Sequence, residues 1–308
     1  MWRRRFLQYL ADPWREWPEG RKHQADKLRV RSRQDARTVI SLARRRFRYQ
    51  PTTLFVINCG SSGSHWLTAM LGVLPNVVDC GEVYLPPGLL AEMDSWSVRE
   101  RSYMVDSIHL AHSPRLDPAV ERAVLINSAH GSGWRIAQAH GAPVKRILLI
   151  RDPLQIVLSR TLRKPDHKKI VARDFSDEAF LETNIEFVRS FFDRAAANPC
   201  DLCVRYEDMR ADPRAVLESV CVMVGLDVSD ADLSGAVVAH GVDSATTNIY
   251  QGPREEVPWH LMDRASEVLH PLRESLGYAP TSDFSKDGQD SELLSSNLHK
   301  GGCARKEG

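Results

Sequence analysis

The loop formed by residues 58–66 is the first part of the chain whose residue types suit ligand binding. It consists of Asn-Cys-Gly-Ser-Ser-Gly-Ser-His-Trp and joins an apolar run to a second run with helical character. A small-residue loop between a strand and a helix presents backbone N–H groups and the positive end of the helix dipole to an anion. The segment predicts a phosphate-binding loop or, alternatively, only a tight turn. Hydroxyl donors for the first interpretation are Ser61, Ser62 and Ser64.

A second segment with chemical potential runs from residue 146 to residue 160. Arg151 follows directly after the apolar run 146–150, and open α/β sheets bind their ligands at the carboxyl ends of such strands. Ser159 lies about two turns into the helix that we expect next. Arginine makes charge-assisted, often bidentate contacts with phosphate, and a serine hydroxyl can complete such a site. The alternative is that Arg151 pairs with Asp152 or with another carboxylate nearby.

The elements that must position these residues follow from the apolar runs. Short runs rich in β-branched residues predict buried strands, and the stretches after them predict helices. Strands that alternate with helices are typical of a parallel sheet covered on both faces. We therefore expect an α/β chain with a three-layer α/β/α sandwich around a central parallel sheet. Gly225 predicts the end of a helix over 213–224, and the predicted strands are 53–57, 123–126, 146–150 and 202–205.

The positive charge of the chain is concentrated in residues 1–50. These carry 15 Lys/Arg and 5 Asp/Glu, whereas all 308 residues together have a formal net charge of +1. The globular part is therefore not basic, and we expect no nucleic-acid binding. We expect a basic, partly helical arm over 1–50, one domain over 51–280 and a disordered tail over 281–308. The arm either makes peripheral contact with an anionic membrane or packs a few aromatics on the domain.

Several classes of protein are excluded by what the sequence lacks. The first residues are basic but have no long apolar stretch of the signal-peptide kind, and no apolar run would span a bilayer, so we expect a cytoplasmic protein. Cys200 and Cys203 form a lone CxxC without the second pair of a zinc site, and we expect both to be small buried residues. The histidines lack the spacing of metal ligands, so we expect no metal.

These two segments and a third resemble the sulfotransferase superfamily that uses 3′-phosphoadenosine-5′-phosphosulfate (PAPS). In that family the 5′-phosphosulfate loop, on the first strand–helix junction, is commonly a basic residue followed by SGTTW, and residues 61–66 fill this place. The 3′-phosphate segment RDPxxxxxS is matched in full by residues 151–159. Residues 205–226 resemble the YEDL-like segment, proline and helix ending before Gly-Leu. The resemblance implies the P-loop-like sulfotransferase fold.

The resemblance also implies a role for each matched residue. Arg151 and Ser159 would hold the 3′-phosphate of PAPS. Trp66 would stack on the adenine, which its large π-face suits, and Tyr206 would lie near it; both are alternatively core residues. The loop residues that would hold the 5′-phosphosulfate are Ser61, Ser62, Gly63, Ser64 and His65.

The chain departs from the family pattern at Ser61, which stands where a Lys or Arg is usual. In the family this cation stabilises negative charge on the bridging oxygen as the sulfuryl group leaves, and losing such a contact costs about 3 kcal/mol. His65 is the nearest replacement, because it lies in the loop and can be cationic. Lys145, Arg146 and Lys164 are further alternatives, and the enzyme could also be slow or inactive.

Sulfuryl transfer to a hydroxyl needs a base that accepts the proton of the attacking group. Gly81-Glu82 resembles the Gly-Glu at the end of a short second strand in tyrosylprotein and some carbohydrate or bacterial sulfotransferases, where the equivalent glutamate has that role. The resemblance therefore implies Glu82 as the catalytic base. Other members use a histidine, for which the alternatives are His109, His112 and His130, each otherwise an ordinary surface or helix-end residue.

Together these features predict a sulfotransferase that transfers a sulfuryl group from PAPS to a hydroxyl of a carbohydrate, glycolipid or other metabolite. The basic stretch 163–169 would favour an anionic acceptor, or it is only a solvated lid. Because of Ser61, the alternative is a catalytically weak or inactive protein of the same fold that binds the nucleotide. A nucleotide kinase would need GxxxxGK[ST], and the chain has neither that lysine nor the Mg²⁺-binding residue after it.

Overall fold

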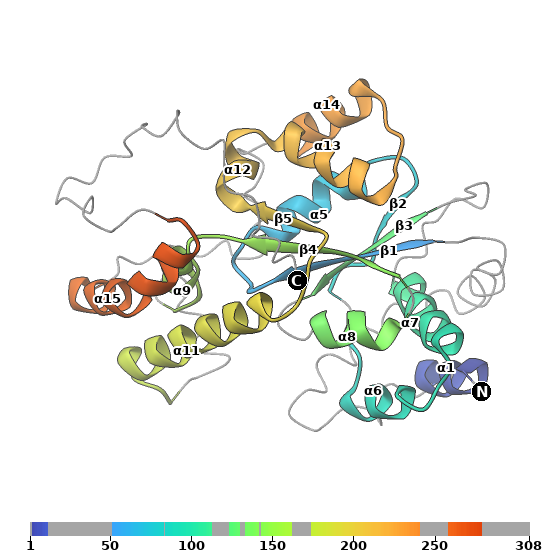
Figure 1. The fold of residues 1–308 in the computed structure, drawn as a ribbon, viewed down its shortest axis with the longest axis horizontal. Coiled ribbons are helices and arrows are strands. Elements are labelled where there is room, and N and C mark those ends of the chain that lie inside the picture. Colours follow the sequence, from blue (N-terminus) through green and yellow to red (C-terminus); the bar gives the residue numbers. More distant parts are fainter. Residues whose placement is uncertain are drawn as a thin grey trace, which may run out of the picture. The chain divides into compact units, whose positions relative to one another are not determined.

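The computed structural model describes residues 2–11, 51–82, 84–112, 123–129, 133–141, 143–161, 174–240 and 258–278 (Figure 1). The chain divides into two compact units. The first comprises residues 1–151 and 190–254, and the second comprises residues 152–189 and 255–308. The predicted end of the arm at residue 50 and the predicted tail after residue 280 lie outside the described residues, so both stay predictions.

The first unit is built on a five-stranded sheet in which all neighbouring strands are parallel. The strand order is β2-β3-β1-β4-β5, so β1 lies in the centre and pairs with β3 and β4. Val56 of β1 lies opposite Ser128 of β3 and Ile147 of β4. All four predicted strands are confirmed, with small differences at their ends. The strands are β1 (Thr52–Asn58), β2 (Val77–Asp79), β3 (Val124–Ala129), β4 (Lys145–Ile150) and β5 (Leu202–Arg205).

Helices cover both faces of this sheet, as Figure 1 shows, and the predicted three-layer α/β/α sandwich is confirmed. One face is covered by α5 (Ser64–Gly72), α12 (Tyr206–Ala211), α13 (Pro213–Val224) and α14 (Asp230–Ala239). On the other side lie α6 (Pro87–Met93), α7 (Val98–His112) and α8 (Gly133–His140), with α1 (Trp2–Ala11) packed against α7. Gly225 ends α13 in the left-handed region at a φ of 69°, as predicted.

Successive side chains of a strand point to opposite faces, and the two faces of β1 have different surroundings. One is apolar, and the other includes polar contacts. Val56 belongs to a fully apolar cluster with side chains from α5, α13 and α14. On the opposite face, the ring of Phe55 lies edge-on to that of His109 in α7, with 5.7 Å between the centroids. On that same face Thr53 donates a hydrogen bond of 2.7 Å to Asp106, also of α7. Polar contacts therefore fix the second helical layer to the sheet.

The second unit contains α9 (Pro153–Thr161) and α15 (Trp259–Ser275), which pack against each other, and most of α11 (Asp177–Ala196). Arg273 of α15 donates two hydrogen bonds of 2.9 Å to the carboxylate of Asp152, just before α9. Such a bidentate contact fixes the direction of both partners. It therefore holds the start of α9 against the C-terminal helix.

Helix α1 is the only described part of the predicted arm. Phe6 is buried in the first unit, and Arg5 donates a hydrogen bond of 2.7 Å to Glu92. This stretch therefore packs an aromatic side chain on the domain, and the predicted membrane contact concerns mainly residues outside the described ranges. Among the described helices, none is long and apolar enough to cross a membrane.

The prediction that Cys200 and Cys203 are buried is wrong. Cys203 is exposed and Cys200 is only partly buried. Strand β5 lies at the edge of the sheet, and within it only Val204 is buried. Because side chains alternate along a strand, Cys203 points to the side opposite Val204, which is left open.

Candidate active site

The loop after β1 has the backbone conformation of an anion-binding site. Gly60, Ser61 and Gly63 have φ values of 75°, 53° and 88°, all in the left-handed region. Backbone N–H groups in such a mixed conformation line a concave surface that suits an anion. The N-terminus of α5 receives no side-chain cap from Gly63, so its first N–H groups remain available for the same ligand. The geometry therefore fits the predicted phosphate-binding loop.

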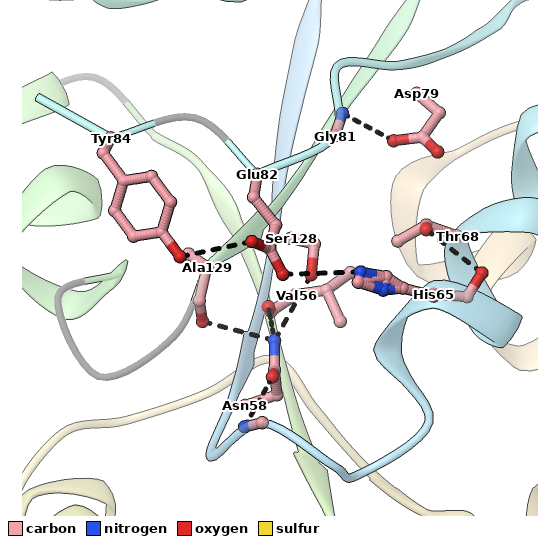
Figure 2. Close-up of polar contacts among 11 residues, drawn as sticks. Val56, Asn58, His65, Thr68, Asp79, Gly81, Glu82, Tyr84, Ser128 and Ala129 are labelled. Atoms are coloured by element: carbon pink, nitrogen blue, oxygen red, sulfur yellow. Dashed lines mark hydrogen bonds and ion pairs between the residues drawn. The ribbon is translucent and has the colours of Figure 1, made fainter. Parts of the chain in front are cut away.

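Asn58, at the end of β1, fixes the start of this loop from inside the sheet. It is fully buried, and its Oδ1 accepts a hydrogen bond of 2.9 Å from the backbone N–H of Gly60. Its Nδ2 donates to the carbonyls of Val56 and Ala129, at 3.1 and 3.4 Å (Figure 2). Our sequence analysis gave this residue no role, although one amide at the end of an apolar strand is a usable signal.

Residues predicted for different parts of a nucleotide site lie together at this loop. The Nη1 of Arg151 donates a hydrogen bond of 3.0 Å to the carbonyl of Ser61. The guanidinium carbon also lies 4.4 Å from the ring centroid of Tyr206, within the range of a cation–π contact. The ring of Tyr206 also packs against Gly63. A Cβ at position 63 would lie only 2.6 Å from the Cδ2 of Tyr206. Trp66 meets Tyr206 edge-on, with 6.0 Å between the ring centroids.

Other predicted binding residues are buried or belong to the second unit. Trp66 is buried in the apolar cluster, and its indole N–H donates to the carbonyl of His240. Ser62 and Ser64 are buried, and the hydroxyl of Ser62 donates to the carbonyl of Gly60 at 3.1 Å. Ser159 lies on α9, in the second unit. Their contacts with a nucleotide stay predictions.

The predicted base is carried by a turn after β2. The N–H of Cys80 and the carbonyl of Gly81 continue the pairing with β3, at 2.9 and 3.0 Å. Asp79 then accepts the N–H of Gly81 at 2.7 Å, and Gly81 itself has a φ of 69°. This turn directs Glu82 toward α5, where its Oε1 lies 3.4 Å from the Nε2 of His65 (Figure 2). The two residues predicted to be catalytic are therefore neighbours.

Tyr84 joins this pair and was missed by our sequence analysis. Its hydroxyl donates to the Oε2 of Glu82 at 3.3 Å. Burial, followed by the negative charge of Glu82, raises the pKa of Tyr84 well above its ordinary range, so the phenol remains a donor at any moderate pH. Tyr84 and the two residues after it lie outside any helix or strand, and no periodic spacing could have connected Tyr84 with Glu82.

None of the alternative bases and cations that the structure describes lies at the loop. His109 is completely buried, with its Nε2 2.9 Å from the Nδ2 of Asn127, so an acceptor could not reach it. The side chain of His112 and all of His130 and Lys164 lie outside the described residues. Lys145 and Arg146 begin β4, opposite Leu54 and Phe55 of β1, whereas the loop leaves β1 at its other end. The backbone of both residues therefore lies away from the loop.

Comparison with known proteins gives matches only among solved structures. No family model and no curated protein matches the chain. The sulfotransferase domain of an olefin synthase from Synechococcus PCC 7002 is 19% identical, covers 75% of this chain and 96% of its own, and has a TM-score of 0.40. Sulfotransferase STF9 from Mycobacterium avium is 12% identical over 85% of this chain and 87% of its own, with a TM-score of 0.48.

Mouse sulfotransferase SULT7A1, solved with 3′-phosphoadenosine-5′-phosphate (PAP), is another similar structure. It is 12% identical, with 72% of this chain and 85% of its own covered and a TM-score of 0.45. All three of these structures are sulfotransferases. At this level of similarity, the function has to be argued from the residues of the chain itself. No group of three or more His, Cys, Asp or Glu suited to a metal ion occurs among the described residues.

Proposed function

We propose that this chain is a sulfotransferase that uses PAPS and transfers its sulfuryl group to a hydroxyl of a carbohydrate, glycolipid or other metabolite. The observation that carries the proposal is the contact between Arg151 and the carbonyl of Ser61. This contact joins the RDP segment to a loop whose backbone suits an anion. Tyr206, from the third family-like segment, lies against both. Three segments far apart in sequence thus supply a cation, N–H donors and an aromatic ring at one edge of the sheet.

Each residue has a part in this proposal. When bound, PAPS supplies the sulfuryl group. The loop binds the 5′-phosphosulfate, Arg151 and Ser159 bind the 3′-phosphate, and Trp66 and Tyr206 lie by the adenine. A guanidinium has five N–H donors, so Arg151 can bind phosphate while it keeps its contact with Ser61. The paired side chains of Glu82 and His65 receive the proton of the acceptor hydroxyl.

Calorimetric titration with PAP tests this proposal. We expect PAP to bind more tightly than adenosine-5′-phosphate, because only PAP has the 3′-phosphate. Arg151→Ala should weaken PAP binding about 10- to 100-fold, the usual worth of a hydrogen bond to a charged group. Arg210→Ala, which removes an exposed arginine of α12, is the matched control and should bind normally. A folded chain that does not bind PAP would exclude the nucleotide site.

Ser61 favours a second candidate function, that of a nucleotide-binding protein of this fold with little or no activity. The test is Ser61→Lys, with PAP released from PAPS as the readout. A large gain in release would indicate that the native loop has lost its catalytic cation. No gain, in a protein that already releases PAP, would indicate that another residue supplies the charge.

A further inference from the structure

His65, Glu82 and Tyr84 form one connected unit beside the loop (Figure 2). Oε1 of Glu82 lies 3.4 Å from Nε2 of His65, and its Oε2 accepts from the hydroxyl of Tyr84 at 3.3 Å. Asp79, the other carboxylate drawn in this view, accepts from the N–H of Gly81 instead. The Glu82 carboxylate therefore lies between an imidazole and a phenol that both can donate a proton to it.

We propose that His65 is the base of the reaction, that Glu82 orients His65, and that Tyr84 is a positioning residue for Glu82. This assignment rests on the proposed sulfotransferase function and makes the role of each residue specific. It reverses the expectation that Glu82 itself takes the proton. It also identifies Tyr84 as part of the site.

Accessibility distinguishes the imidazole from the carboxylate. The side chain of His65 is 42% exposed and that of Glu82 only 20%. With Nε2 turned to Glu82, the neutral ring carries its proton on Nε2 and a lone pair on Nδ1. Among the described residues we find no partner for Nδ1 of His65, so this nitrogen is the one open to a hydroxyl. The separation of 3.4 Å is loose, as such contacts often are before a substrate binds.

The transfer of the acceptor proton to His65 creates a positive charge in the site, which has no lysine at position 61. The acceptor O–H bond breaks, its proton goes to Nδ1 of His65, and its oxygen forms the new bond to sulfur. The bond from sulfur to the 5′-phosphate oxygen breaks, and PAP leaves with the electron pair. His65 becomes an imidazolium, stabilised by Glu82, as negative charge appears on the leaving group. The base thus turns into the cation that Ser61 does not provide.

Tyr84 acts through Glu82. Its phenol stays protonated, so it can donate only to the carboxylate and cannot take the proton itself. By holding Oε2 it leaves Oε1 turned toward His65. Its removal should loosen Glu82 without removing any reacting atom.

Nitrogen-15 NMR of labelled histidine tests the coupling without any turnover. The chain has 11 histidines, and the His65 signals are identified by their loss in His65→Gln. We expect neutral His65 to carry its proton on Nε2. In Glu82→Gln this preference for the Nε2 proton should weaken, because the carboxylate that accepts from Nε2–H is gone. Tyr84→Phe should give a smaller change. The same tautomer of His65 in wild type and Glu82→Gln would overturn the proposal.

Release of PAP from PAPS, with water as the acceptor, tests the base itself in the full chain. His65→Gln keeps an N–H for Glu82 but cannot accept a proton, and we expect about a 100-fold loss or more. Tyr84→Phe should lose about 2- to 10-fold, the worth of one hydrogen bond. His270→Gln is a matched control, because His270 lies 3.4 Å from Glu274 with similar exposure, in the other unit; it should release PAP normally.

The outcomes separate this assignment from the proposed function. Normal release in His65→Gln together with complete loss in Glu82→Gln would make Glu82 the base, and the sulfotransferase function would stand. A wild-type chain that binds PAP but releases none from PAPS would overturn the base assignment and the enzymatic function together, leaving nucleotide binding. Failure to bind PAP at all would remove the proposed function itself.

Discussion

Two histidine–carboxylate pairs in the first unit use the same chemistry in opposite surroundings. His140 and Asp106 are 2.7 Å apart, with side chains 4% and 1% exposed. His65 and Glu82 are 3.4 Å apart, with side chains 42% and 20% exposed. The first pair is short, closed to solvent and cannot meet a substrate. The second is loose and accessible. The difference shows that surroundings, rather than residue type, separate a pair that is closed to ligands from one that a ligand can reach.

The buried pair of His140 and Asp106 holds the second helical layer on the sheet. Asp106 of α7 accepts from the Thr53 hydroxyl of β1 and contacts His140 of α8, each at 2.7 Å. One carboxylate thus connects a strand with two helices. A buried donor that loses its acceptor is costly, and these contacts should therefore matter for folding.

The more exposed pair of His65 and Glu82 can contribute little to the free energy of unfolding. Exposed ion pairs are typically worth less than about 1 kcal/mol, because water screens them and ordering the side chains costs entropy. Breaking the buried pair should therefore lower the free energy of unfolding much more than breaking the exposed pair. Five substitutions, taken from the largest expected effect to the smallest, test this difference and the loop beside it.

The largest effect is expected for Asp106→Ala. It leaves His140 and Thr53 buried without their shared acceptor, and the free energy of unfolding should fall by about 3–5 kcal/mol. Urea denaturation followed by circular dichroism measures this, with Asp193→Ala on an exposed helix face as the control. A loss below about 1 kcal/mol would mean that the buried pair is not structural.

Gly63→Ala should cost less, about 1–3 kcal/mol, but should also impair the site. The φ of 88° is strained for any residue with a Cβ, and the new atom would lie 2.6 Å from the ring of Tyr206. PAP binding should weaken together with stability, measured by calorimetry and denaturation of the same sample. Gly235→Ala is the control, because a Cβ there meets nothing within 4 Å. Unchanged PAP binding would show that the loop does not need this close contact.

Thr53→Val should cost about 1 kcal/mol, the net worth of one hydrogen bond. The substitution keeps the shape and removes the donor to Asp106. PAP binding should not change, since Thr53 lies at the start of β1 and the loop at its end. The same denaturation experiment applies, and an effect as large as that of Asp106→Ala would point to repacking rather than to a lost hydrogen bond.

The smallest stability effect is expected for His65→Gln and Glu82→Gln. Each should change the free energy of unfolding by less than about 0.5 kcal/mol, while release of PAP from PAPS falls strongly. Denaturation and turnover measured on the same preparations give both numbers. A stability loss comparable to that of Asp106→Ala would remove the distinction between the two pairs.

The features that could be predicted from the sequence are those that depend on interactions between neighbouring residues. Apolar runs marked β1, β4 and β5, and Gly225 marked the end of α13, because strand burial and helix termination depend on neighbouring residues. Arg151 could be placed at a strand end by the same means. The loop at 60–63 was found from its small residues, although its left-handed backbone could not be predicted in detail.

The arrangement around Glu82 could not be predicted, because it depends on strand order. Strand β2 is separated from β1 by β3, which comes later in the chain, and only this order brings the turn after β2 toward α5. The contact of Tyr84 with Glu82 further depends on an irregular segment. Likewise, Asp106 and His140 come from helices separated by β3, and no sequence pattern connects them.

The position of β1 also has a consequence for how the site forms during folding. Its two partners, beginning at Val124 and Lys145, are synthesised much later, and such distant parallel pairings form slowly. On the ribosome, β1 and its glycine-rich loop therefore emerge long before β4 can bring Arg151 to Ser61. The anion site is completed only when the sheet closes. If the proposed nucleotide site is correct, a partly folded chain should have no means of capturing nucleotide, and nucleotide binding would report on finished assembly of the first unit.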